Sequence, residues 1–248
     1  MSDSNRMRYA RLYPEPGELT LEELRDQLEF PTLEDRPYTI ANFVSSADGR
    51  AAMSGRSAPL SDDGDRALFH ALRERVDGVM VGTGTLRTER YGALIRNDEA
   101  CRRRIERGLE PQPLACLVTR SGALPLDISL FTQARVLAFA PEAIDGVETV
   151  ILDATELTLT AVMRRLRADH GVRSLLCEGG PTLFGSLIHE GLVDELFLTL
   201  APKLAGGGTA PTISSGAELA EPAVMQIRSV LERSGSLFLR FVVSGEAE

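Results

Sequence analysis

The chain is poor in the features that mark secreted and membrane proteins. Its 248 residues include three cysteines, Cys101, Cys116 and Cys177, and this odd, widely spaced set predicts free thiols in a reducing cytoplasm. No apolar run approaches the ~20 residues that a membrane span needs. The first residues, Met1 to Ser4, contain no apolar core of a secretory signal. We therefore expect a cytoplasmic protein without a membrane partner.

Metal and nucleophile motifs are also missing. The three histidines, His70, His170 and His189, do not have the spacing of a metal site. The zinc-deaminase pattern is absent, and so is the Gly-x-Ser-x-Gly elbow of hydrolases. Lys203 is the only lysine, so there is no Walker motif, and the Rossmann glycine fingerprint is absent as well. The sequence thus predicts no metal cofactor, and any dinucleotide must be held by a different fold.

Positive charge is scarce relative to negative charge. Lysine and arginine number 27 against 36 aspartates and glutamates, so the formal net charge is −9 and the pI is near 5.0. This balance argues against nucleic-acid binding, although a local pocket of opposite sign can still hold a small anion. Hydrophobic residues make up 43% of the chain and charged residues 25%, which predicts an ordinary globular protein.

What the chain does have is a regular alternation of apolar runs and amphipathic segments. The apolar runs predict strands at residues 38–45, 78–81, 114–119, 136–140, 149–152, 174–177 and 195–201. Helical spacing and capping residues predict helices at residues 20–28, 61–75, 158–166 and 181–190. Segments 224–231 and 237–243 alternate polar and apolar residues and predict a terminal hairpin. This order is typical of an α/β fold with a mostly parallel central sheet, helices on both faces and antiparallel strands at one edge.

Two segments lack such periodicity. Residues 1–37 are predicted to form an N-terminal arm with one short helix, which Thr20 and Glu23 begin as a capping box. Residues 97–113 are rich in arginine and are predicted to be an irregular, solvent-exposed excursion. Residues 38–248 contain no linker or internal repeat, so we expect them to form one domain.

The most informative motif follows the predicted strand 174–177. Glu178 ends the apolar run, Gly179 and Gly180 come next, and Pro181 opens a helical pattern. Paired glycines let the backbone approach a ligand closely. A strand that turns through glycines into a helix directs free N–H groups and a positive dipole end at one point, which favours phosphate. An ordinary strand-to-helix turn is the alternative.

Three further positions follow predicted strands, where open α/β sheets bind ligands. Asp48 follows the first strand and suits a polar heterocycle or proton transfer, with an Asp-Gly turn as the alternative. Gly82 and Gly84 flank hydroxyl residues that suit a pyrophosphate or a nicotinamide. Arg120 ends the strand 114–119 and suits a 2′-phosphate, with a surface turn as the alternative.

Taken in order, these motifs resemble one family, the pyrimidine reductases of riboflavin biosynthesis, whose fold is like that of dihydrofolate reductase. The matching segments are residues 46–50, 81–85, 178–183, 192–196 and 201–207. The resemblance covers about residues 38–243. In bifunctional members of the family the reductase follows a zinc deaminase, whose motif this chain lacks.

The resemblance implies NADPH-dependent reduction of a phosphorylated heterocycle, 5-amino-6-(5-phosphoribosylamino)uracil, with hydride delivered to the sugar C1′. It implies cofactor contacts by Val44, Gly82, Gly84, Thr85, Glu89, Arg120, Gly179, Gly180, Pro181, Thr182 and Leu183. It implies substrate contacts by Ser57, Arg73, Arg96 and Glu178, with the two arginines as partners of the phosphate. Asp48 and Glu178 are the candidates for proton handling, and the family favours a homodimer.

The chain departs from the family pattern at two places near the expected substrate or nicotinamide. Asn42 stands where the family often has a lysine, and Glu89-Arg90-Tyr91 stands where it usually has an Asp-Asn-Pro or Asp-Asp-Pro turn. Two alternatives therefore accompany the main hypothesis. One is a divergent reductase of a pterin or dihydrofolate, and the other is a nucleotide-binding module without catalysis.

Overall fold

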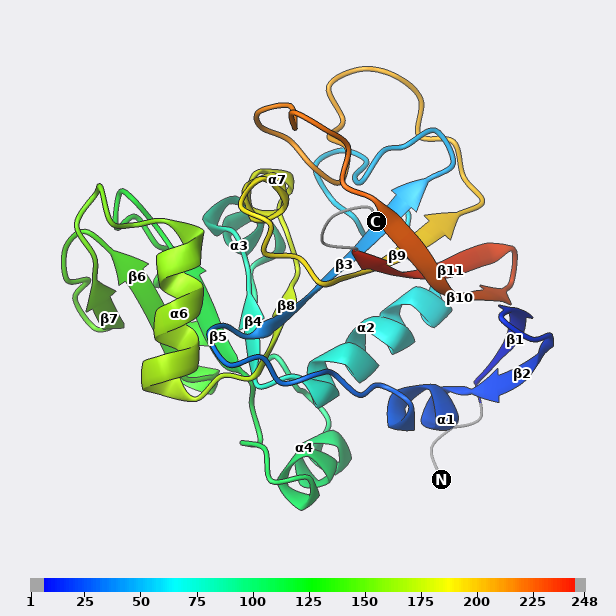
Figure 1. The fold of residues 1–248 in the computed structure, drawn as a ribbon, viewed down its shortest axis with the longest axis horizontal. Coiled ribbons are helices and arrows are strands. Elements are labelled where there is room, and N and C mark those ends of the chain that lie inside the picture. Colours follow the sequence, from blue (N-terminus) through cyan, green and yellow to red (C-terminus); the bar gives the residue numbers. More distant parts are fainter. Residues whose placement is uncertain (1–6, 244–248) are drawn as a thin grey trace.

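The computed structural model describes residues 7–243 and arranges them around one mixed sheet (Figure 1). The strands are β1 (Arg8–Tyr13), β2 (Gly17–Thr20), β3 (Tyr38–Ser46), β4 (Gly78–Met80), β5 (Leu114–Val118), β6 (Val136–Ala140), β7 (Glu148–Ile151), β8 (Ser174–Cys177), β9 (Glu195–Ala201), β10 (Met225–Arg233) and β11 (Ser236–Val243). Their order across the sheet is β2-β1-β10-β11-β9-β3-β8-β4-β5-β6-β7.

Four of the helices begin close to where the sequence predicted them, whereas the helices at residues 83–89, 98–106 and 130–133 were not predicted. The helices are α1 (Leu21–Asp26), α2 (Asp63–Arg75), α3 (Thr83–Glu89), α4 (Asp98–Glu106), α5 (Leu130–Gln133), α6 (Leu159–His170) and α7 (Pro181–His189). The capping box of Thr20 and Glu23 at α1 is confirmed, with both reciprocal hydrogen bonds present. Asp62 and Thr158 cap α2 and α6 in the same way, each accepting a backbone N–H three residues later.

The sheet has a parallel part and an antiparallel part. From β9 to β7 in the spatial order, neighbouring strands run parallel. β10 and β11 pair antiparallel through a two-residue turn at Ser234 and Gly235, which both have positive φ, and β11 continues antiparallel onto β9. The predicted α/β fold, mostly parallel with a terminal hairpin, is confirmed.

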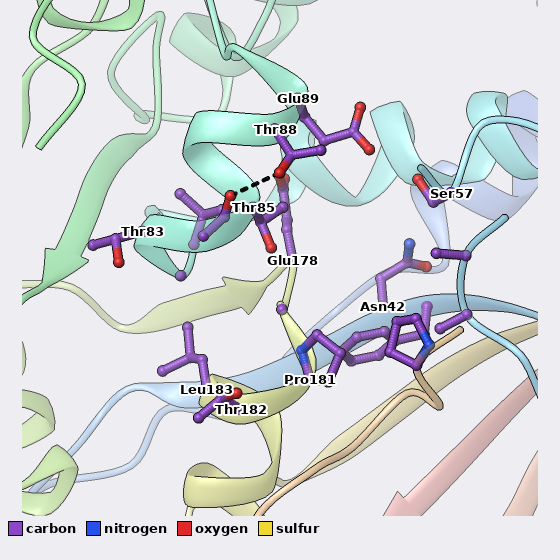
Figure 2. Close-up of a pocket in the computed structure, with 18 of the residues that line it drawn as sticks. Asn42, Ser57, Thr83, Thr85, Thr88, Glu89, Glu178, Pro181, Thr182 and Leu183 are labelled. Carbon is purple, nitrogen blue, oxygen red and sulfur yellow. Dashed lines mark hydrogen bonds between the residues drawn. The ribbon is translucent and has the colours of Figure 1, made fainter. Parts of the chain in front are cut away.

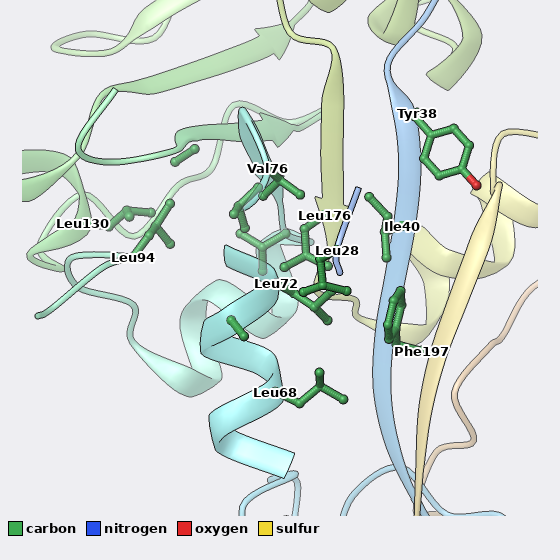
Figure 3. Close-up of a cluster of buried hydrophobic side chains, with 14 of the residues drawn as sticks. Leu28, Tyr38, Ile40, Leu68, Leu72, Val76, Leu94, Leu130, Leu176 and Phe197 are labelled. Atoms are coloured by element: carbon green, nitrogen blue, oxygen red, sulfur yellow. The ribbon is translucent and has the colours of Figure 1, made fainter. Parts of the chain in front are cut away.

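Helices cover both faces of the parallel part, and each face has its own hydrophobic core. Along β3, Ile40 packs in one cluster with Leu68 and Leu72 of α2 (Figure 3). The next side chain, Ala41, packs in the other cluster with residues of α6 and α7, including Phe184. Because β3 is buried on both faces, it reads in sequence as a nearly continuous apolar run.

The N-terminal segment contributes strands that the sequence did not predict. β2 pairs with β1, and β1 pairs with β10, so both extend the antiparallel edge of the sheet (Figure 1). Tyr9 is fully buried, packs edge-on against Phe238 and donates to the Gly64 carbonyl at 2.8 Å. Residues 8–20 are therefore packed strands and not a free arm, while the division of the chain into 1–37 and 38–248 stays a prediction.

The expected irregular excursion at 97–113 is wrong, because its first half forms α4. Asn97 caps the helix by accepting the N–H groups of Glu99 and Ala100. Arg104 is 1% exposed and donates to the carbonyls of Arg73, Val76 and Glu110. The arginine cluster concealed this helix, since one of its arginines serves a buried structural role that composition does not reveal.

Within residues 7–243, no helix is both long enough and apolar enough to cross a bilayer. The same part of the chain contains no group of three or more histidine, cysteine, aspartate or glutamate side chains placed to hold a metal ion. Cys101, Cys116 and Cys177 are free thiols, and the last two are buried in the sheet.

Candidate active site

A cavity of about 960 Å³ lies at the carboxyl ends of β3, β4 and β8, where open α/β sheets bind ligands. β8 pairs parallel with both β3 and β4, so the segments that follow the three strands meet at one edge. Figure 2 shows Thr83 on one side of the cavity and Ser57 on the other, with Glu178 and Pro181 between them. The cavity therefore extends from the helix starts after β4 and β8 to the loop after β3.

Two helices begin at this cavity without side-chain caps. α3 begins after Gly82 and α7 after Gly180, and neither glycine can accept the first N–H groups of its helix. The Gly82 N–H donates to the Gly179 carbonyl at 2.7 Å, which holds the two helix starts side by side. Two positive dipole ends thus face one cavity, an arrangement that suits a diphosphate.

Close packing requires glycine at these helix starts. A Cβ on Gly82 would lie 3.1 Å from the backbone nitrogen of Gly180, and a Cβ on Gly180 would lie 2.8 Å from Thr85 Oγ1. Gly179 has a φ of +86°, and a Cβ there would lie 3.0 Å from the Phe43 ring. The glycines keep both helix starts close together and leave their backbone open to a ligand.

Glu178 is held at the cavity by a buried network. Arg73 donates through Nε and Nη2 to the two Glu178 carboxylate oxygens at 2.6 and 2.7 Å, and the Tyr91 hydroxyl donates at 2.8 Å. The remaining Arg73 nitrogen, Nη1, donates to the Leu94 carbonyl at 3.0 Å. Burial, and then the nearby Glu178 charge, raise the pKa of Tyr91 well above its ordinary value, so its hydroxyl keeps its proton. These contacts fix the orientation of the Glu178 carboxylate.

Asp48 lies outside the cavity, in the turn after β3. Its carboxylate accepts the Ser46 hydroxyl at 2.5 Å and the N–H groups of Ala205 and Gly206 at 3.0 and 2.7 Å. These hydrogen bonds, that of Ser46 above all, lower the pKa of Asp48 to about 2. Asp48 therefore joins two loops as an anion, and its assignment as a proton donor is not supported.

Asp65, on the first turn of α2, is a second buried carboxyl group that lines the cavity. The residue is 7% exposed. The Ser61 hydroxyl donates to its Oδ2 at 2.5 Å. Burial raises the pKa of Asp65, which this hydroxyl only partly opposes.

The comparison with known families assigns the chain to one family. Residues 37–237 match the family model described as the RibD C-terminal domain. The chain belongs to this family.

Relatives of this RibD-family chain are named as reductases of a pyrimidinone phosphate or as riboflavin biosynthesis proteins. A 2,5-diamino-6-ribosylamino-4(3H)-pyrimidinone 5′-phosphate reductase of Archaeoglobus fulgidus is 31% identical over 192 residues, which are 73% of this chain and 87% of the relative. The riboflavin biosynthesis protein RibD of Mycobacterium tuberculosis is 32% identical over 174 residues, which cover 69% of this chain and 44% of that protein. The enzyme class expected from the sequence, an oxidoreductase of riboflavin biosynthesis, is confirmed.

Solved structures of the RibD family have the same fold. A pyrimidine reductase-like protein of Corynebacterium diphtheriae aligns with a TM-score of 0.79 at 22% identity, covering 92% of this chain and all of that one. Acinetobacter baumannii RibD aligns with a TM-score of 0.70 at 23% identity, covering 85% of this chain and 58% of that one. These likenesses support the α/β architecture and its sheet order.

The cavity brings together most of the residues expected from the resemblance. Those that line it are Val44, Ser57, Gly82, Gly84, Thr85, Glu89, Arg120, Glu178, Gly180, Pro181, Thr182 and Leu183. Gly179 is buried behind the α7 start. Neither arginine expected at the substrate phosphate lines the cavity, because Arg73 is committed to Glu178 and Arg96 is exposed elsewhere.

Sequence reasoning missed several polar residues of the cavity, among them Asp65, Arg66 and Tyr91. Asp65 and Arg66 read as ordinary charges on the first turn of a helix, although both line the cavity. Tyr91 was noticed only as a departure from the family turn, and in the structure it completes the Glu178 network. An acidic residue on an apolar helical stripe was the one signal for Asp65, since it stands three residues before Leu68.

Proposed function

We propose that this RibD-family protein uses NADPH to reduce a ribosylamino-pyrimidine 5′-phosphate in riboflavin biosynthesis. The observation that carries the proposal is the pair of uncapped helix starts, α3 and α7, joined at the cavity by the Gly82–Gly179 hydrogen bond. Names of the relatives support the substrate class, since they specify reduction of a pyrimidinone carrying a ribosylamino group and a 5′-phosphate.

The cofactor fits the side of the cavity formed by residues 82–85 and 180–183, which offers mainly backbone groups. The first N–H groups of α3 and α7 would bind the diphosphate, because two uncapped helix starts meet there. Arg120 is exposed and lines the cavity beyond the end of β5, where its guanidinium would pair with a 2′-phosphate. Val44 and Thr85 also line the cavity and would position the nicotinamide ring.

The substrate fits the side built by side chains. Glu178, fixed by Arg73 and Tyr91, offers carboxylate oxygens to sugar hydroxyls. Ser57 lines the same side, and Arg66 is the arginine of α2 that reaches the cavity.

The reaction transfers a hydride and a proton. A bound nicotinamide cofactor supplies the hydride, and the protein supplies orientation and electrostatics. The C1′–H bond forms as the C1′–O4′ bond of the ribose opens, and a proton from solvent water goes to O4′, giving the ribityl chain. Of the two carboxyl groups expected to handle a proton, Glu178 alone lines the cavity, and its role is to orient the sugar.

The test is a substrate screen that follows NADPH oxidation by the loss of its near-ultraviolet absorbance. We expect turnover of a ribosylamino-pyrimidine 5′-phosphate, with the ribityl product identified by mass spectrometry. Turnover of dihydrofolate without turnover of a ribosylamino-pyrimidine 5′-phosphate would instead favour a pterin reductase. Cofactor binding without any turnover would favour the nucleotide-binding module.

We also propose that the protein works in the cytoplasm as a homodimer, as the family resemblance implies. Sedimentation equilibrium at micromolar concentration distinguishes a monomer of 26.9 kDa from a species of twice that mass.

A further inference from the structure

Asp65 is a buried carboxyl group that the protein itself leaves without a positive partner. Among residues 7–243, no arginine, lysine or histidine nitrogen lies within ion-pair distance of its carboxylate, since even the neighbouring Arg66 pairs with Asp63, and the side-chain hydrogen bond that it accepts comes from the Ser61 hydroxyl. Glu178, buried in the same cavity, is paired with Arg73 on both oxygens. A buried carboxylate with only a hydroxyl partner is costly, so a further donor from a ligand would stabilise it.

The place of Asp65 specifies which part of a ligand reaches it. Asp65 and Phe69 of α2, and Ser61 just before that helix, line the cavity. An aromatic side chain next to a carboxylate suits the flat face and the polar edge of a heterocycle. The 5′-phosphate cannot bind here, because two negative groups would repel each other.

The two pyrimidines of the proposed reaction differ at the edge that such a carboxylate recognises. A 2-amino-4(3H)-pyrimidinone presents two parallel donors, N3–H and the 2-amino group, which match the two oxygens of a carboxylate. The corresponding uracil presents N3–H beside the C2 carbonyl oxygen, which is an acceptor. A carboxylate therefore gains two hydrogen bonds with the first ring and one hydrogen bond plus a repulsive contact with the second.

We propose that Asp65 binds the N3–H and 2-amino edge of the pyrimidine and makes the protein selective for the 2,5-diamino-pyrimidinone phosphate over its uracil analogue. This inference rests on the proposed function and names the specificity-determining residue for it. It also orders the reactions. Reduction of the sugar precedes loss of the 2-amino group, so a hydrolytic deamination must consume the product.

Replacement of Asp65 by asparagine is the most direct test of this proposal. Asparagine has nearly the same shape and changes one of the two acceptor oxygens into a hydrogen-bond donor. Its carbonyl still accepts N3–H, while its amide N–H donates to a C2 carbonyl oxygen and meets a 2-amino group as a second donor. In Asp65→Asn we expect the preference to change in favour of the uracil, because the polar match is reversed.

The experiment measures kcat/KM with NADPH for both pyrimidine phosphates in the wild type, in Asp65→Asn and in Asp145→Asn, an exposed aspartate outside the cavity. In the wild type we expect at least a tenfold preference for the diamino compound, and in Asp65→Asn a loss of at least tenfold in that ratio. NADPH affinity stays unchanged in both variants, and Asp145→Asn keeps the wild-type ratio.

Equal kcat/KM values for the two compounds in the wild type overturn the inference while leaving the proposed function intact. A wild-type ratio that Asp65→Asn preserves, in a variant with unchanged circular dichroism, also overturns it. No turnover of either compound contradicts the proposed function itself. Should Asp65→Asn fail to fold, the preference of the wild type for one of the two compounds decides the question. The inhibition constants of isocytosine and uracil against the wild type give a second measurement, and we expect isocytosine to bind more tightly.

Discussion

The cavity is built in two different ways on its two sides. The cofactor side, residues 82–85 and 180–183, offers backbone N–H groups at two helix starts with glycines that keep them open. The substrate side, formed around Asp65 and Glu178, offers buried side chains held by other side chains. Backbone groups recognise what every dinucleotide shares, whereas individually placed side chains distinguish one small molecule from another.

The difference also sets how each side responds to change. The cofactor side depends on local chain geometry, so a single added methyl group is enough to disturb binding. The substrate side depends on contacts between distant parts of the chain, and loss of one partner leaves a buried charge. Four substitutions separate these behaviours, and they are ordered here by the size of the expected effect.

Arg73→Ala is expected to have the largest effect, and on stability. It removes the cation from a pair whose side chains are 7% and 1% exposed, which leaves Glu178 buried without its charge partner. We expect a loss of about 3–5 kcal/mol in the free energy of unfolding, measured by urea denaturation. Arg135→Ala, which breaks an exposed pair with Glu148, is the matched control and should cost less than about 1 kcal/mol. Equal losses in the two variants would contradict the role of the buried pair.

Arg120→Ala tests the far end of the cofactor side. If Arg120 pairs with a 2′-phosphate, its removal weakens NADPH binding by about 1.5–3 kcal/mol and leaves NADH binding nearly unchanged. Dissociation constants for both nucleotides, measured by calorimetry, give the comparison. An equal loss for NADPH and NADH would remove Arg120 from the 2′-phosphate site.

Gly82→Ala tests the junction of the two helix starts. The new Cβ would lie 3.1 Å from the Gly180 nitrogen and 3.4 Å from the Gly179 oxygen, so the backbone must shift to admit it. We expect cofactor affinity to fall about tenfold, in line with the cost of overpacking. Gly207→Ala, which meets nothing within 4 Å and lies outside the cavity, is the control. Unchanged affinity in Gly82→Ala would place the diphosphate elsewhere.

Tyr91→Phe is the mildest change and acts on the substrate side. It removes one of three hydrogen bonds to Glu178 while Arg73 keeps the other two. We expect a loss of about 0.5–1.5 kcal/mol in stability and a rise in KM for the pyrimidine substrate, with cofactor affinity unchanged. Weaker NADPH binding with an unchanged substrate KM would show that Tyr91 belongs to the cofactor side.

Local patterns in the sequence were sufficient for the parallel core and for the start of α7. The apolar run of β3 predicts a strand buried on both faces, and Gly180 with Pro181 predicts a helix that begins after a strand without a side-chain cap. β1, β2, α3, α4 and α5 escaped prediction, because edge strands and short helices have weak periodicity and gain their stability from packing on distant residues.

The sequence by itself determined most of the alternation of strands and helices and the start of a helix after Gly180, because these depend on neighbours within a few positions. Only the tertiary structure decided that Arg73 pairs with Glu178, 105 residues later, and that Asp48 ties a loop while Asp65 lines the cavity. The role of a charged side chain depends on burial and on the partner that folding brings within hydrogen-bond distance, and neither is encoded in local spacing.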